Sequence, residues 1–279
     1  MNSQYALVAV SVFILLTTSL GATYISIIGP VTANLTQNQT IYLGKVGPGQ
    51  SFYVLANATT TNASGTKLIN IGWDKLYAPL LPQGWSMQQS PLYENPMKMK
   101  ITVAPNAAYG EYKVPLTAVN VGNYSKLGNM TFFAYVNVTS NVFQLNVSPT
   151  TVSAGTGQPV NLYITINNTG ISDDPFIINA YGLPAWNISY QVISIHGIAK
   201  TFIYPVFIDE PGQYKFNLTV TSSSSNLVSQ SYGIDLISQA SLLNDYSAIG
   251  QGVVLSPVLY GPVYSVMLLI NYLYSLIAK

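Results

Sequence analysis

One short motif occurs twice in this chain, and the two copies begin 102 residues apart. GEYKVPLTA begins at Gly110 and GQYKFNLTV begins at Gly212, with five of nine positions identical. Two Leu-Pro pairs, at residues 81–82 and 183–184, repeat the same spacing. A period of this size corresponds to a domain, because solenoid repeats have periods of roughly 20–50 residues. The sequence therefore predicts two tandem copies of one module.

Within each copy, apolar and polar residues alternate over short stretches that are rich in β-branched and aromatic side chains. Such alternation predicts β-strands, and it is clearest at residues 98–103, 131–138, 160–166 and 216–221. No helical period is evident between residues 23 and 238. Many short strands separated by Asn, Gly and Pro turns predict an immunoglobulin-like sandwich. Tyr112 and Tyr214 each follow a turn glycine, which predicts a tyrosine corner in both copies.

The order of these features resembles a known family of β-sandwich modules. Each copy has Leu-Pro, then Trp, then a hairpin, then a turn that ends in Gly-x-Tyr; the turns are PNAAYGEY at residues 105–112 and DEPGQY at residues 209–214. This pattern is similar to the NEW family and to related cell-adhesion-type sandwiches of archaeal surface proteins. The resemblance covers most of residues 25–238. It implies an immunoglobulin-like fold and an extracellular setting, and it implies no activity.

Glycosylation sequons and the missing cysteines indicate the compartment. Asn-x-Ser/Thr accepts sugar only outside the cytoplasm. The chain has no Cys, whereas secreted animal domains usually carry disulfides. Together these features predict a glycoprotein of an archaeal cell surface. The eleven predicted acceptors are Asn34, Asn38, Asn57, Asn62, Asn123, Asn129, Asn137, Asn146, Asn167, Asn187 and Asn217.

Both ends of the chain are apolar. Residues 1–22 have an apolar core and a small-x-small cleavage site, which predicts a signal peptide. Because no basic residue precedes the core, an uncleaved membrane anchor is the alternative. Residues 246–279 carry no charge before the final lysine and exceed the roughly 20 apolar residues that span a bilayer. They predict a C-terminal transmembrane helix, with a buried core helix or a lipid-anchor signal as alternatives. Residues 23–140 and 141–240 are the two expected sandwiches.

Few residues are suited to catalysis or to binding a cofactor. The net charge is +1 and arginine is absent, so we expect no nucleic-acid partner. With one histidine and no cysteine, the sequence predicts neither a cofactor nor a His/Cys metal site, and no enzyme activity. His196 is expected in a solvated turn. The adjacent Asp173 and Asp174 are expected to form a polar loop, with a calcium site as the alternative.

The tryptophans suggest where a ligand could bind. Trp85 and Trp186 follow the two Leu-Pro pairs and are therefore expected in the two cores. Trp73 and Tyr77 lie in a stretch of the first copy with no counterpart in the second, and they are the candidates for a ligand surface. The alternative for Trp73 is an aromatic side chain packed under a long loop.

These observations lead to one expected function and two alternatives. We expect a single-pass protein of the cell membrane whose bulk is extracellular, acting as a stalk or as an S-layer-associated protein. Its partners would be membrane lipid, through the C-terminal helix, and another cell-surface protein. The alternatives are an extracellular glycan- or solute-binding module, and a subunit of a surface filament that uses residues 23–33 as a donor strand.

Overall fold

The computed structural model describes residues 24–61, 67–121, 127–183, 189–208 and 210–239, together with residue 270. Regular structure in the described part of residues 24–239 consists of β-strands, which confirms the all-β class. The chain divides into two compact units, residues 1–138 (unit 1) and 139–279 (unit 2). No helix within the described residues has the length and hydropathy to cross a membrane. The predicted signal segment, and the predicted transmembrane segment apart from residue 270, lie outside the described residues.

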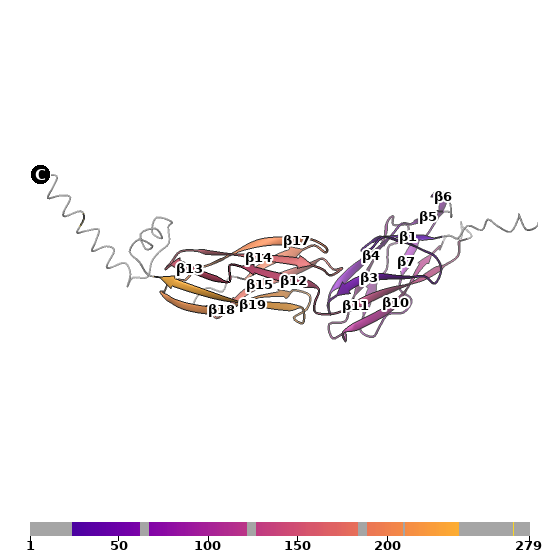
Figure 1. Cartoon of the computed structure of the whole chain (residues 1–279). Coiled ribbons are helices and arrows are strands. Elements are labelled where there is room, and N and C mark those ends of the chain that lie inside the picture. Colours follow the sequence, from indigo (N-terminus) through magenta and orange to yellow (C-terminus); the bar gives the residue numbers. More distant parts are fainter. Residues whose placement is uncertain are drawn as a thin grey trace, which may run out of the picture. The chain divides into compact units, whose positions relative to one another are not determined.

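Unit 1 is a sandwich of two sheets with an added hairpin (Figure 1). The sheet orders are β2-β1-β4-β9-β8 and β3-β11-β10-β7, and β5 pairs with β6. The first strand, β1, pairs antiparallel with β4, and β3 runs parallel to the last strand, β11. This is an immunoglobulin-like arrangement. The strands are β1 (Ile25–Gly29), β2 (Ala33–Leu35), β3 (Thr40–Val46), β4 (Ser51–Ala56), β5 (Thr59–Thr61), β6 (Lys67–Gly72), β7 (Lys75–Tyr77), β8 (Ser86–Gln88), β9 (Met97–Thr102), β10 (Gly110–Val119) and β11 (Met130–Val138).

Unit 2 repeats this topology with one strand moved. The sheet orders are β12-β14-β17 and β13-β19-β18-β15-β16, and β13 runs parallel to β19 as β3 does to β11. In unit 1 the short strand β8 joins β9, whereas in unit 2 the corresponding strand β16 joins β15 in the opposite sheet. The strands are β12 (Phe143–Ser148), β13 (Thr151–Gly155), β14 (Val160–Asn168), β15 (Asp174–Tyr181), β16 (Tyr190–Ser194), β17 (Ala199–Val206), β18 (Gly212–Ser222) and β19 (Ser229–Gln239).

Alternating side chains build the core between the two sheets of each unit. Every second residue of β11 and of β14 is buried, as the sequence alternation requires. The four strands predicted most clearly coincide with β9, β11, β14 and β18, so these predictions are confirmed. In unit 2 the rings of Phe143 and Phe176, contributed by opposite sheets, lie 4.7 Å apart between centroids. Burying a side chain of this size stabilises the fold by about 1.5–3 kcal/mol.

Both predicted tyrosine corners are present. The Tyr112 hydroxyl donates a hydrogen bond to the Ala108 carbonyl oxygen at 2.8 Å, and the Tyr214 hydroxyl donates to the Glu210 carbonyl oxygen at 3.2 Å. Each tyrosine lies two residues into its strand, β10 or β18. The preceding Gly110 has a φ of 144°, a conformation that favours glycine. The repeated motif therefore has a structural role in both units.

The segment expected as a free donor strand is already paired. Residues 25–29 form β1, which pairs with β2 and with β4 inside unit 1. Ile25 and Ile27 are almost completely buried in the core of that unit. The feature that would have favoured a filament subunit is therefore engaged within its own sandwich.

Candidate functional site

The predicted sugar acceptors lie on accessible surface wherever the structure describes them. Five are exposed and three are half-buried, and none is buried. They occur on both sheets of both units, for example Asn34 on β2, Asn137 on β11, Asn146 on β12 and Asn217 on β18. A buried position would prevent sugar attachment. Asn168, the middle residue of the Asn167 sequon and not an acceptor, is 2% exposed. Asn62, Asn123 and Asn187 lie outside the described residues.

The structure places Trp73 in the core of unit 1, which corrects the expectation of a surface role. Its side chain is 2% exposed, and its indole nitrogen is buried without a hydrogen-bond partner among the described residues. The alternative was an aromatic side chain packed under a long loop, and its burial is confirmed for this residue. Tyr77 is half-buried on β7, and the Lys75 ammonium lies 5.4 Å from its ring centroid. A ligand role for Tyr77 stays a prediction.

A pocket of about 380 Å³ lies at the tyrosine corner of unit 1. Trp85 and Tyr112 line it with rings whose centroids are 5.1 Å apart, and Gln83 and Asn106 add side-chain amides. Trp85 is largely buried, as expected for a core residue, and its indole nitrogen has no hydrogen-bond partner among the described residues. No lining side chain is charged. Sequence reasoning assigned Trp85 and Tyr112 separately to the core and the corner, so it missed that they share a pocket.

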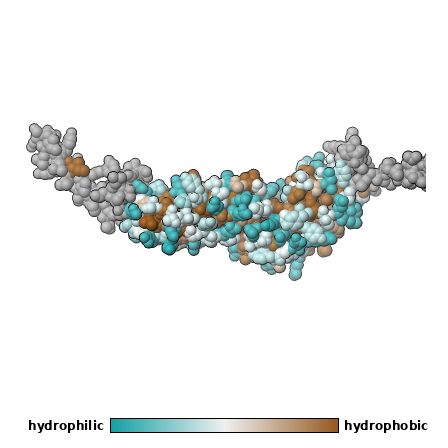
Figure 2. Space-filling model, viewed as in Figure 1, coloured by the Kyte–Doolittle hydropathy of each residue, from teal (hydrophilic) through white to brown (hydrophobic). Residues whose placement is uncertain are grey.

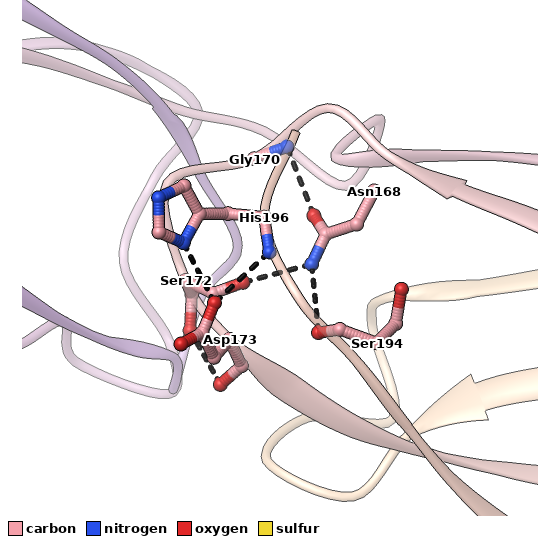
Figure 3. Close-up of polar contacts among 6 residues, drawn as sticks. All are labelled: Asn168, Gly170, Ser172, Asp173, Ser194 and His196. Atoms are coloured by element: carbon pink, nitrogen blue, oxygen red, sulfur yellow. Dashed lines mark hydrogen bonds and ion pairs between the residues drawn. The ribbon is translucent and has the colours of Figure 1, made fainter. Parts of the chain in front are cut away.

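His196 is held by Asp173 in unit 2 (Figure 3). The ring nitrogen Nδ1 lies 2.6 Å from Asp173 Oδ1, and the His196 backbone N–H donates to the same oxygen at 2.9 Å. The exposed turn position agrees with the prediction, but the partner is 23 residues away in the chain and was not anticipated. In Figure 3 the other ring nitrogen points away from Ser172 and Ser194. The pair therefore has the geometry of a loop clasp, and neither serine drawn in Figure 3 meets the second ring nitrogen as a triad nucleophile would.

The same contacts set the acidity of Asp173. Partial burial acts to raise the pKa of this carboxyl group, because desolvation disfavours its charged form. The two hydrogen bonds from His196 and the attraction of its imidazolium act in the opposite direction and outweigh the burial. The net result is a pKa below the ordinary value of 3.8. Asp173 therefore stays charged to a lower pH than an ordinary aspartate does.

The buried amide of Asn168 lies beside this clasp (Figure 3). Asn168, at the end of β14, donates to the carbonyl oxygens of Ser172 and Ser194 at 2.9 and 3.2 Å. Its own oxygen accepts from the Gly170 N–H at 3.0 Å. One side chain therefore ties the loop after β14 to the end of β16. The role of Asn168 is structural, which explains why it is buried beside the accessible acceptor Asn167.

The neighbouring carboxyl group, Asp174, points the opposite way. It is 0% exposed and accepts hydrogen bonds from the hydroxyls of Ser222, at the end of the neighbouring strand β18, and of Ser224 just beyond it, the latter at 2.7 Å. The expected polar loop is thus correct for Asp173 and wrong for Asp174. No group of three or more acidic, His or Cys residues that could hold a metal occurs in the described residues. The two carboxyl groups do not converge, as a calcium site would require.

Comparison with known proteins supports no assignment finer than the fold. No family model and no curated protein sequence matches this chain. Similar solved structures include a chimeric titin Z1Z2 functionalized with a KLER exogenous peptide from decorin. The match has 15% sequence identity and a TM-score of 0.35, and it covers 80% of this chain and 100% of that chain. The D00-D0 domain of intimin has 12% identity, coverages of 76% and 99%, and a TM-score of 0.26. A β-glucosidase from Listeria innocua in complex with glucose has 15% identity, coverages of 43% and 20%, and a TM-score of 0.27.

The strand orders define the class of this protein: two immunoglobulin-like β-sandwich modules in tandem. Each unit has its own core, its own tyrosine corner and its own parallel pairing of an early strand with the last strand. The resemblance to the NEW family in particular stays a prediction.

Proposed function

We propose that this chain is a glycosylated structural or interaction protein of the archaeal cell surface, anchored by residues 246–279. Its two sandwiches, modules related to the NEW family, would act as a stalk or would contact an S-layer or another surface protein. The proposal combines the apolar ends of the sequence with the two extracellular-type modules between them.

The observation that carries this proposal is the accessibility of the sugar acceptors. All eight acceptors in the described residues are exposed or half-buried, and they cover both sheets of both units. Most lie on strands or beside them, where Ser or Thr two residues later is on the same face, as at Asn217 and Thr219 of β18. On the face drawn in Figure 2, hydrophobic residues lie in small groups among hydrophilic ones. Such a surface suits a protein wetted by sugars and hydroxyl groups.

Glycopeptide mass spectrometry of the protein isolated from its native membranes tests this proposal. We expect sugar on Asn146 and Asn217, and none on Asn161, an exposed asparagine of β14 that lies outside any sequon. Protease treatment of intact cells should cleave the sandwiches, and the chain should stay with the membrane in high salt. Unmodified acceptors together with protection from the protease would contradict the extracellular location. Recovery in the soluble fraction would contradict the anchor alone.

The partner is identified by crosslinking mass spectrometry on intact cells. We expect crosslinks between lysines of the sandwiches, such as the exposed Lys113 and Lys215, and one abundant surface protein. Crosslinks confined to membrane lipids and to many unrelated proteins, with no dominant partner, would contradict a stalk or lattice-associated role.

The pocket at the tyrosine corner of unit 1 favours a second candidate function, the binding of a neutral glycan. Its lining combines two aromatic rings with the amides of Gln83 and Asn106 and contains no charge. Aromatic rings pack on the apolar faces of sugar rings, and amides bond their hydroxyl groups. Titration with oligosaccharides, followed by tryptophan fluorescence, tests this function. Gln83→Ala should weaken binding, whereas Gln213→Ala, an exposed glutamine of unit 2, should leave it unchanged. Equal effects of the two substitutions would exclude the pocket.

A further inference from the structure

The strand β17 forms an edge of unit 2 that pairs with no further strand among the described residues. It is the last strand of the sheet β12-β14-β17, and its eight residues make it the longest edge strand in the sheets of the described chain. Its register with β14 runs without a shift from Val206 to Ala199. In unit 1 the corresponding strand β9 is covered by β8, but β16 has moved to the opposite sheet. A long, regular, open edge is a template for pairing with another strand.

The hydrogen-bonding pattern shows which backbone groups face outward. Ala199 is opposite Asn167 in the register, and the Asn168 N–H donates to the Ile198 carbonyl oxygen at 3.5 Å. In an antiparallel pair, bonded positions alternate along the strand. The even-numbered residues of β17 therefore bond to β14. Ala199, Thr201 and Ile203 direct their N–H and C=O groups toward the open edge, where no strand of the described chain pairs with them.

The other edge strands are shorter, irregular or occupied. On β12 the Gln230 side chain bonds backbone groups of the strand. Its amide nitrogen donates to the Phe143 carbonyl oxygen at 2.6 Å, and its oxygen accepts from the Leu145 N–H at 3.2 Å. The register of β3 shifts beside Gly44. The edge strands β2, β7 and β8 have three residues each. Natural sheets are protected by such devices, and the only residues of this kind in β17 are Lys200 and Pro205.

We propose that this edge pairs antiparallel with the β17 edge of a second copy of the chain, around a two-fold axis at Thr201. Pro205 has no N–H to donate, so a pairing centred on Ile203 would lose hydrogen bonds at its ends. Centring on Thr201 uses only residues with both groups available: Thr201 faces Thr201 of the second copy, and Ala199 faces its Ile203. The two three-stranded sheets then form one continuous sheet of six strands.

The side chains on this edge are compatible with their own copies. The two-fold register places Lys200 directly opposite Phe202 of the second copy, and not opposite its Lys200. The Lys200 ammonium already lies 5.3 Å from the centroid of the Phe202 ring in its own chain, so the contact across the axis is of a favourable kind. Ile203 is 58% exposed and would be covered beside Ala199 of the second copy. No sequon lies within β17, and the pairing depends on neither the sugars nor the membrane anchor of the proposed function.

A single introduced cysteine tests the contact in the full-length chain, which has no cysteine of its own. Residues that face each other in a hydrogen-bonded antiparallel pair have Cα atoms about 5.5 Å apart, within the range that a disulfide spans. Mild oxidation of Thr201→Cys in detergent should therefore produce a disulfide-linked dimer. The control is Ser153→Cys, an exposed position on the edge strand β13 of the other sheet. Equal dimer yields from the two variants, or none from either, would overturn the proposal.

Opposite charges at the axis provide a second test that does not require oxidation. Thr201→Lys and Thr201→Glu should each weaken self-association about fivefold or more, because like charges face each other across paired strands. An equimolar mixture should restore the dimer as a heterodimer, measured by sedimentation velocity with circular dichroism as the control for folding. Self-association that is unaffected by either charge, or a wild-type chain that stays monomeric, would overturn the pairing. Neither result would affect the glycosylation or membrane tests above.

Discussion

Replacing Asp174 by alanine should destabilise unit 2 strongly, whereas the same change at Asp173 should have little effect. Asp174 opens β15 with no exposed surface, and it accepts hydrogen bonds from Ser222 and Ser224 at the end of β18. Asp173 is adjacent in the chain, but its side chain is 57% exposed and pairs with His196 at the surface. The two residues have the same chemistry and different environments, so each is the control for the other.

The magnitude follows from the bonds that are lost. A hydrogen bond to a charged group contributes about 1.5–3 kcal/mol, so two of them contribute about 3–6 kcal/mol. Removing a buried carboxylate also relieves its desolvation, which offsets part of the loss. We therefore expect Asp174→Ala to lower the free energy of unfolding of unit 2 by about 3 kcal/mol. Asp173→Ala breaks an exposed ion pair, which is worth about 0.2–1 kcal/mol.

Hydrogen–deuterium exchange with mass spectrometry measures each unit separately in the intact chain. A loss of 3 kcal/mol accelerates exchange through global opening about 150-fold, since about 1.4 kcal/mol corresponds to tenfold. The acceleration should be confined to peptides from unit 2, such as those from β15 and β18, and peptides from β10 and β11 should be unchanged. Ser224→Ala removes one of the two bonds and should give an intermediate result. Equal exchange in the two aspartate variants would refute the buried network.

Three further changes have defined outcomes. Phe in place of Tyr112 or Tyr214 removes one hydroxyl bond and should cost about 0.5–1.5 kcal/mol in its own unit, measured by the same exchange experiment; loss of protection in the other unit would contradict the assignment. Asp173→Asn should remove a small stabilisation that is present at neutral pH. Because the folded pKa lies below the unfolded value of 3.8, that stabilisation disappears as the pH falls through the folded pKa, so denaturant titrations of Asp173→Asn and the wild type should converge only in strong acid. Gly72→Ala would place a Cβ against the Ala58 carbonyl oxygen and should abolish protection in β6, whereas a wild-type exchange profile would contradict this geometry.

Sequence patterns predicted the elements whose signals are local. Alternation over β11 and β14 reflects a sheet with one buried face, and the motif Gly-x-Tyr requires only a turn and a nearby carbonyl group. The tyrosine corner closes over four residues, from Tyr112 to Ala108 and from Tyr214 to Glu210. Such features are determined by neighbours in the chain, so they are visible in the sequence.

The misjudged residues depend on contacts with distant parts of the chain. Trp73 lies in a stretch without a repeat counterpart; its side chain is buried, and its backbone N–H donates to the Ala58 carbonyl oxygen, 15 residues earlier. Asp174 receives its hydrogen bonds from serines 48 and 50 residues away, and His196 finds its carboxylate 23 residues earlier. Adjacent residues of an extended chain point to opposite faces, as Asp173 and Asp174 do. This rule does not show which of the two faces is the interior, so the sequence predicted one polar loop for both residues.

The position of one short strand determines which surface each unit presents. The strand β8 pairs with β9 from Ser86 to Gln88, directly after Trp85 packs on Tyr112, so the corner and the covered edge of unit 1 share one segment. In unit 2 the corresponding strand β16 pairs with β15, and Ser194 at its end is held by Asn168. A strand that extends one sheet cannot cover the edge of the other. The same topology that creates a five-stranded sheet in unit 2 therefore exposes β17, and pairing between two copies of β17 would complete the edge that β8 completes in unit 1.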